Sequence, residues 1–188
     1  ELGGLYLQAK ANTFFEVITA NPPAANQSIY FHKEKNIAAY TQFSGTYKKL
    51  NYTLGLRAEN TIVDGKYQAA TEPTVAKNFI NLFPKAQFEV VIDSSNTVSL
   101  NYAKTIARPD YSSTSQTSTY INPYFVWSDN INLNPTFTDE IALGYQYKDK
   151  SIRLAYYKIT NPVYYSASYD NNQKLLTFTS KNLSKSSE

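Results

Sequence analysis

The fold is decided by one strictly alternating stretch, Asn51-Tyr52-Thr53-Leu54-Gly55-Leu56-Arg57-Ala58-Glu59. Its even-numbered residues are apolar, whereas its odd-numbered residues are polar, charged or glycine. Successive side chains of a β-strand point to opposite sides, so a period of two residues predicts a strand with one apolar and one polar face.

The same alternation recurs along the chain, in segments 5–11, 86–92, 98–102, 141–147 and 152–156. The connections between these segments alternate in length. Short polar turns are expected at 47–50, 93–96 and 148–150, and long irregular connections at 17–28, 64–77 and 108–139. Short turns on one side and long loops on the other are typical of an outer-membrane barrel, whose periplasmic turns are short.

We therefore predict an all-β fold, an antiparallel up-and-down meander of about eight strands that forms part of a larger transmembrane β-barrel. The expected strands are 4–16, 29–46, 51–63, 79–92, 97–107, 140–148, 151–168 and 174–182. The apolar residues of 52–58, 98–102 and 141–147 should face lipid as one belt. Pro162 lacks a ladder donor and should mark a bulge or the point where its strand leaves the bilayer.

The composition favours strands over helices. The chain has 17 Tyr and 10 Phe, residues that suit pleated strands, and no stretch approaches the roughly 20 apolar residues of a membrane helix. Tyrosines near strand ends suit the aromatic girdles of a barrel; they are Tyr40, Tyr47, Tyr52, Tyr145, Tyr147 and Tyr156. The net charge of +3 is scattered along the chain, so no nucleic-acid partner is expected.

Several motifs, in order and at matching spacing, resemble the barrel segment of Bacteroidetes-type TonB-dependent outer-membrane receptors. They are Ile37-Ala38-Ala39-Tyr40, Gly55-Leu56-Arg57-Ala58-Glu59-Asn60-Thr61, Leu82-Phe83-Pro84, Asn101-Tyr102-Ala103-Lys104-Thr105-Ile106-Ala107-Arg108-Pro109 and Ile121-Asn122-Pro123-Tyr124. Segment 132–140 looks like a shortened form of the family's stretch before its next strand, without the Gly-Asn-Pro start. The resemblance covers nearly the whole chain.

This resemblance implies a transporter in the bacterial outer membrane. Its expected partners are outer-membrane lipid, a small-molecule or oligomeric nutrient, a surface lipoprotein, and the TonB energy-transducing complex, reached through an N-terminal region that this chain lacks. Residues 1–188 would then be a fragment of a transmembrane barrel domain without plug, TonB box or closing strands. The absence of Met and of a signal-peptide pattern also predicts that the sequence begins inside a longer protein. What carries over to single positions is architectural: Gly55, Arg57 and Glu59 on a strand, Arg108-Pro109 where a strand gives way to an outer loop, and Asn122-Pro123 within it.

Two sets of residues are candidates for ligand binding. The first shares the inward parity of a barrel lumen and consists of Arg57, Glu59, Glu89 and Arg153, accompanied by Gln8, Lys10, Gln87 and Gln146. These side chains either line a substrate path or hydrogen-bond the plug and each other. The second set lies in the longest loop and consists of Tyr124, Phe125 and Trp127. These aromatic rings either contact the ligand or anchor the loop on neighbouring strands.

Neither catalysis nor a cofactor is expected. His32 is the only histidine, no serine lies in a nucleophile-elbow motif, and the chain has no cysteine. Acidic residues occur singly on strands or at turns, so no metal ligand set is predicted. Two alternatives to a transporter remain: a soluble β-sandwich that binds or adheres through packed apolar faces, and a passive structural barrel.

Overall fold

The computed structural model describes residues 2–18, 25–67, 75–110, 113–114 and 118–183, and the side chains of residues 2, 4–32 and 66–75 lie outside the description. The described residues form eleven strands. Their bounds are β1 Leu2–Ile18, β2 Ala25–Tyr47, β3 Leu50–Tyr67, β4 Val75–Val91, β5 Asn96–Ala107, β6 Ser118–Asn122, β7 Phe125–Ser128, β8 Thr136–Tyr147, β9 Lys150–Thr160, β10 Val163–Asp170 and β11 Leu175–Asn182. Within these residues, no helix is long and apolar enough to cross a membrane.

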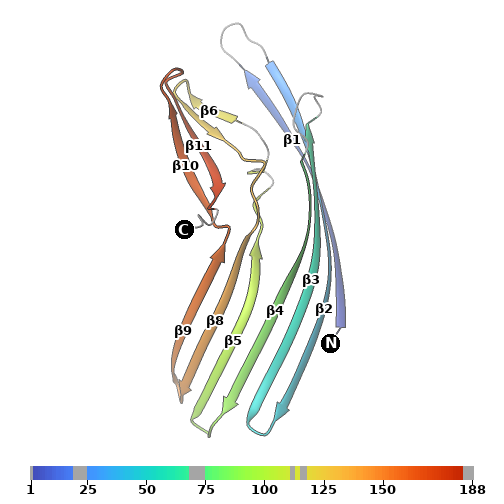
Figure 1. Cartoon of the computed structure of the whole chain (residues 1–188), viewed down its shortest axis with the longest axis vertical. Helices are drawn as coiled ribbons and strands as arrows, with labels where there is room; N and C mark the ends of the chain where they lie inside the picture. The colour runs from blue at the N-terminus through green and yellow to red at the C-terminus, as the bar shows by residue number, and fades with distance from the viewer. Residues whose placement is uncertain (1, 19–24, 68–74, 111–112, 115–117, 184–188) are drawn as a thin grey trace, which may run out of the picture.

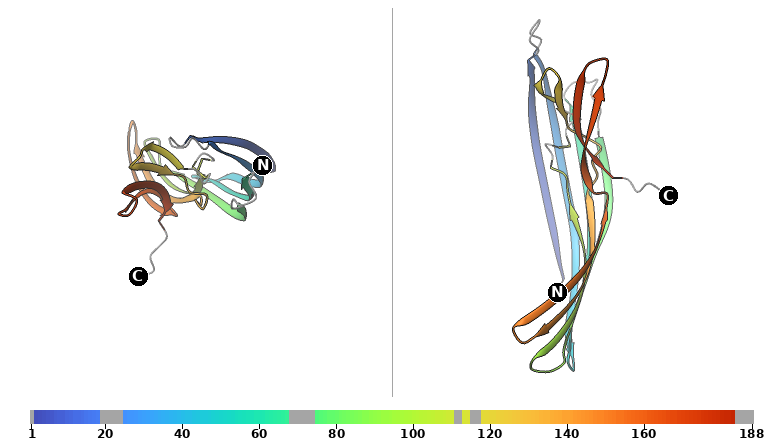
Figure 2. Two further views of the ribbon diagram at one scale, coloured as in Figure 1. Left: turned by 90° about the horizontal axis from the view of Figure 1, so that it is seen from above. Right: turned by 90° about the vertical axis from the view of Figure 1, so that its left-hand side faces the viewer.

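Seven of the strands form one antiparallel sheet in the order β1-β2-β3-β4-β5-β8-β9. They run side by side, and their tight turns lie together at one end (Figure 1). The predicted meander is confirmed for this sheet. A smaller sheet of order β10-β11-β7-β6 lies toward the opposite end, as Figure 2 also shows. Its β11–β7 pair is parallel, which is a departure from a pure up-and-down meander.

The predicted strand 151–168 is wrong as a single element. The ladder of β9 ends at Thr160, and β10 begins at Val163 in the other sheet. Between them, Asn161 adopts a left-handed backbone with φ 54°, and Pro162 has no N–H to donate to a ladder. Pro162 was expected to mark either a bulge or the point where its strand leaves the bilayer. In the structure it lies where the chain leaves the large sheet.

The longest connection is also more regular than expected. It contains β6 and β7, and β8 starts at Thr136 rather than at 140. Strands of only four or five residues have no long alternation in sequence, so the period-two signal is too brief to detect them. The turns at 47–50, 93–96 and 148–150 are confirmed.

One face of the large sheet carries the apolar belt. The register joins Tyr52 to Phe88, Phe88 to Leu100, Leu100 to Leu143 and Leu143 to Leu154. The three predicted apolar sets therefore lie on one face. Leu100, Leu143 and Leu154 are 45%, 48% and 66% exposed. A soluble sandwich would bury such residues in a shared core, whereas a barrel turns them to lipid.

The opposite face is polar. Thr53 pairs with Ser44 and with Gln87, and Gln87 pairs with Asn101. The Oγ atoms of Ser44 and Thr53 lie 3.0 Å apart in a hydrogen bond across the strands. Below, this side of the sheet is called the lumen face.

Register corrects one assignment made from sequence. Tyr40 pairs with Arg57 and so lies on the lumen face, not in a lipid-facing girdle. The side chains of Gln8 and Lys10, also expected in the lumen, lie outside the description. Alternation shows that two faces differ, but the partner strand decides which of them meets lipid.

A charged side chain on the apolar belt should lower the stability of the barrel. We expect Leu100→Arg in the full-length protein to destabilise the barrel by about 2–4 kcal/mol, because Leu100 lies mid-belt where lipid cannot solvate the charge. Asn101→Arg, one residue along on the lumen face, should change stability by about 0.5 kcal/mol or less. Urea unfolding in lipid vesicles measures both, and equal effects would contradict the assignment of faces.

The large sheet should also associate when the chain is produced alone. β1 and β9 each pair with only one neighbour among the described strands, so each has an edge of free N–H and C=O groups. We expect 1–188 to elute as oligomers without detergent. A sharp monomeric peak with cooperative thermal unfolding would count against a barrel fragment.

Candidate functional site on the lumen face and outer loop

The four lumen candidates share one face but lie at three places. Arg57 and Glu59 are neighbours on β3, with 3.4 Å between Arg57 Nη2 and Glu59 Oε2. Glu89 lies near the turn end and accepts a hydrogen bond from Asn51 Nδ2 at 3.2 Å. Arg153 on β9 pairs with Glu140. The predicted common face is confirmed, while a single site built from all four is not formed.

Four charged side chains of the lumen face form a group of ion pairs, which we call the lumen cluster. They are Glu34, Arg57, Glu59 and Arg108. Arg108 follows directly after β5, and its Nη2 contacts Glu59 Oε1 while its Nε lies 3.6 Å from Glu34 Oε1. Glu59 is thus held between two arginines, and its side chain is only 6% exposed. Two carboxylates and two guanidinium groups balance, as a buried ionic cluster requires.

Neutral side chains complete the cluster. Asn36 Nδ2 donates to Glu34 Oε1 at 2.7 Å, and Thr61 Oγ1 donates to Asn36 Oδ1 at 2.7 Å. Thr61 is 1% exposed and lies on β3 two residues beyond Glu59. These bonds orient the Glu34 carboxylate, and Thr61 Oγ1 also lies 3.3 Å from Glu59 Oε1, so neutral side chains contact both carboxylates of the cluster.

Aromatic packing supports the arginine on β3. The Arg57 guanidinium lies 4.6 Å from the ring centroid of Phe83, its cross-strand partner. Phe83 is 5% exposed and stacks on Phe137 at 6.4 Å between centroids. A cation over a buried ring is favourable because the ring face carries negative charge.

The outer loop is fixed to the same face by Lys77 of β4, which lies beyond the belt residue Ile80. Lys77 Nζ donates to the carbonyl oxygens of Leu133 at 2.8 Å and Ile131 at 3.3 Å. Ile131 and Leu133 are buried, with 6% and 3% exposure. Lys77 and Arg108 line one small hollow with Glu34 and Thr61.

The same loop segment is also tied to the small sheet. Asn130 Nδ2 donates to Ser180 O at 2.9 Å, and Asn134 N donates to Asn182 Oδ1 at 2.7 Å. Asn182 Nδ2 returns a bond to Asn134 O at 3.0 Å. Residues 129–135 therefore connect the small sheet to the lumen wall.

The three aromatic candidates of the loop have different surroundings. Trp127 stacks on Phe178 at 6.3 Å and meets Tyr165 edge-on at 5.4 Å. Phe125 also contacts Phe178 edge-on at 5.0 Å. These contacts match the anchoring alternative, whereas Tyr124 is 66% exposed. A ligand role for any of the three stays a prediction.

Sequence reasoning did not select Arg108, Lys77 and Glu34 as site residues. Arg108-Pro109 was recognised only as the place where a strand gives way to a loop. Its partners lie 49 and 74 positions earlier in the chain, so no local spacing could reveal them. Over the described residues, no cluster of His, Cys, Asp or Glu side chains fits a metal ion.

Loss of Arg108 should destabilise the barrel more than loss of an exposed arginine. Arg108→Ala leaves Glu59 buried with one partner, and we expect a loss of about 2–4 kcal/mol in unfolding free energy. Arg153→Ala is the matched control, because Arg153 is 56% exposed in its pair with Glu140 and should contribute less than about 1 kcal/mol. Urea titration of the full-length protein in vesicles measures both. An Arg108 effect no larger than that of Arg153 would contradict a structural role for the cluster.

The sequence model of the outer membrane protein beta-barrel family matches residues 5–188. No curated protein matches. The crystal structure of the siderophore receptor PirA from Pseudomonas aeruginosa is similar over 96% of this chain and 45% of that chain, at 10% identity and a TM-score of 0.45. At this score the likeness carries no conclusion about function, and this chain spans under half of that receptor.

The family match covers nearly all residues, and the exposed apolar belt is independent physical evidence for a lipid-facing sheet. The resemblance stated from the sequence motifs is confirmed at the level of this family. The chain belongs to the outer membrane protein beta-barrel family and lies in the bacterial outer membrane.

Proposed function

We propose that this chain is part of the barrel wall of a transport receptor that takes up a nutrient by binding it at the cell surface and gating its passage. The observation that carries the proposal is the outer loop held against the lumen face. Arg108 contacts Glu59 and Glu34, and Lys77 contacts the carbonyls of Leu133 and Ile131. A loop held on the inner wall narrows the outer mouth, which suits a gated path better than an open pore.

The character of the lumen face supports a wide, wet interior. A broad hollow along β2 to β5 is lined by the polar side chains of Ser44, Thr46, Asn51, Thr53, Gln87, Glu89, Ser99 and Asn101. About eight strands close into a barrel whose interior is filled by side chains, and wider barrels leave a channel or hold a plug. A sheet of seven strands with polar groups along its inner side fits the wider class.

Energy coupling and partners follow from the resemblance. The receptor would be driven by the TonB complex, and a surface lipoprotein would assist capture of the nutrient. The cargo is a small-molecule or oligomeric nutrient, and uptake needs binding and release without covalent chemistry or a cofactor. Arg57, Glu59, Glu89 and Arg153 would then line its path, and Tyr124, Phe125 and Trp127 would lie at its entrance.

A test separates ligand contact from loop anchoring. In the full-length receptor, Tyr124→Ala should lower uptake about tenfold and leave heat stability unchanged, because the ring is exposed. Trp127→Ala should lower stability by about 2 kcal/mol, because it removes contacts to Phe178 and Tyr165. Receptor-dependent growth on single nutrients measures uptake, and heat modifiability on gels measures stability.

The outcomes are distinct. Uptake unaffected by Tyr124→Ala would remove this residue from the binding surface and shift attention to Arg57, Glu59, Glu89 and Arg153. If cells with and without the intact receptor grew equally well on every nutrient tested, a passive structural barrel would be favoured.

A further inference from the structure

Two hairpin turns at the same end of the large sheet carry the same local arrangement. Lys48 follows Tyr47 in the β2–β3 turn, and Lys148 follows Tyr147 in the β8–β9 turn. Both lysines have a left-handed backbone, with φ 54° and 49°. In both turns, the ammonium lies 5.4 Å from the ring centroid of the preceding tyrosine. The repeat places a cation beside an aromatic ring twice, on hairpins far apart in sequence.

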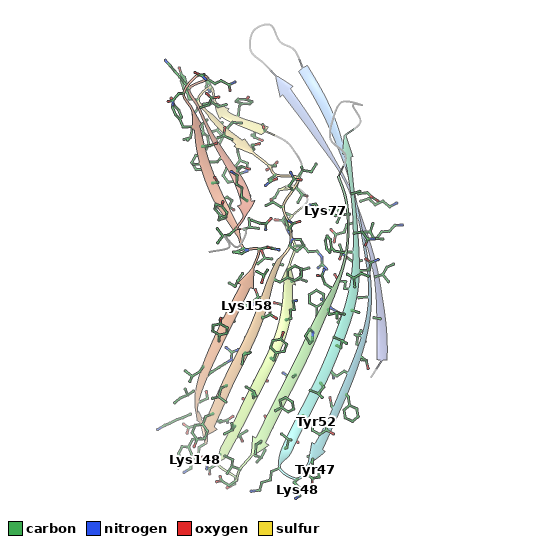
Figure 3. The ribbon with its side chains drawn as sticks, in the orientation of Figure 1. Tyr47, Lys48, Tyr52, Lys77, Lys148 and Lys158 are labelled. Carbon is green, nitrogen blue, oxygen red and sulfur yellow. The ribbon has the colours of Figure 1, made fainter. Side chains whose placement is uncertain are left out.

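The tyrosines of these turns end the apolar belt. Tyr47 pairs with Leu50 and Tyr147 with Lys150, both with the parity of the apolar face. Tyr47 and Tyr147 are 65% and 45% exposed. Figure 3 shows Tyr47, Lys48, Tyr52 and Lys148 gathered at the turn end, far from Lys77. An amphipathic ring at the edge of an apolar belt belongs at the headgroup level of a bilayer.

A shallow hollow lies between the first two turns, lined by Lys48, Lys49, Asn51, Val91, Ile92 and Asp93. Its only acidic side chain is engaged within its own turn, since Asp93 Oδ1 accepts from Ser95 N at 2.8 Å and from Asn96 Nδ2 at 2.9 Å. Lys49 Nζ donates to the Ile92 carbonyl. Of its two apolar side chains, Val91 has the parity of the lumen face, whereas Ile92 follows the end of β4 and is 45% exposed beside the basic groups.

We propose that the turn end of the sheet is a phospholipid-binding collar, in which Lys48 and Lys148 contact headgroup phosphates of the periplasmic leaflet beside Tyr47 and Tyr147. Short turns of outer-membrane barrels lie on the periplasmic side. A lysine ammonium binds phosphate as a point charge, and its long stem lets it reach the headgroups from the belt edge. The apolar rings and Ile92 would contact the first acyl carbons, which free phosphate lacks.

The collar goes beyond the proposed transport function and can be tested apart from it. The variant is Lys48→Asn with Lys148→Asn in the full-length receptor. Asparagine adopts the left-handed region more readily than lysine, so the turns keep their fold while losing both cations. The control is Lys174→Asn, because Lys174 has the same backbone, with φ 53°, in the β10–β11 turn of the small sheet.

Native mass spectrometry of the delipidated receptor, titrated with phosphatidylglycerol, measures binding. The double variant should bind it about tenfold more weakly than the wild type, whereas Lys174→Asn should bind it normally. The collar would be overturned if the double variant bound phosphatidylglycerol as tightly as the wild type. It would also be overturned if Lys174→Asn weakened binding as much as the double variant does. Inorganic phosphate that competes fully would show a plain anion site, and tighter binding of lipid A through the same lysines would overturn the periplasmic placement.

Discussion

Everything in this structure depends on pairing the backbone of the strands with neighbours. Inside a bilayer no water is available to N–H and C=O groups, so a strand can cross only if the ladders on its two sides satisfy them. The unbroken registers from β1 to β9 meet this need for the inner strands of the sheet. Because side chains alternate across each strand, the same ladders also align one apolar face against lipid and one polar face toward the lumen.

Two ladders of the large sheet end beside a proline, and at one of them a residue with a left-handed backbone precedes it. The β4–β5 ladder stops at Lys85 opposite Ala103, next to Pro84, whose nitrogen has no hydrogen to donate. The β9 ladder ends before Asn161 and Pro162, after which the chain joins a different sheet. Beyond these points, water or other segments can satisfy the backbone, so the outer part of the chain is free to adopt shorter strands and loops.

Hydrogen bonds and an ion pair join the outer loop to the lumen wall. Residues 129–135 bond to Lys77 of β4 on one side and to Ser180 and Asn182 on the other. Arg108 begins the loop and closes the lumen cluster through Glu59. A short chain of hydrogen bonds therefore links the small sheet to the charged wall of the lumen.

The sequence by itself determined most strands of the large sheet, its tight turns and its two-faced character, because a period of two residues is a local property of the chain. Arg57 and Glu59 were also placed correctly on the polar face. Only the tertiary structure decided that Arg108 and Glu34 complete their cluster, that Lys77 holds the loop, and that Phe125 and Trp127 pack on Phe178. These contacts join residues far apart in sequence, so they depend on register and on where the chain leaves the sheet. The facing of Tyr40 likewise followed from its partner strand, because alternation defines two faces without saying which one meets lipid.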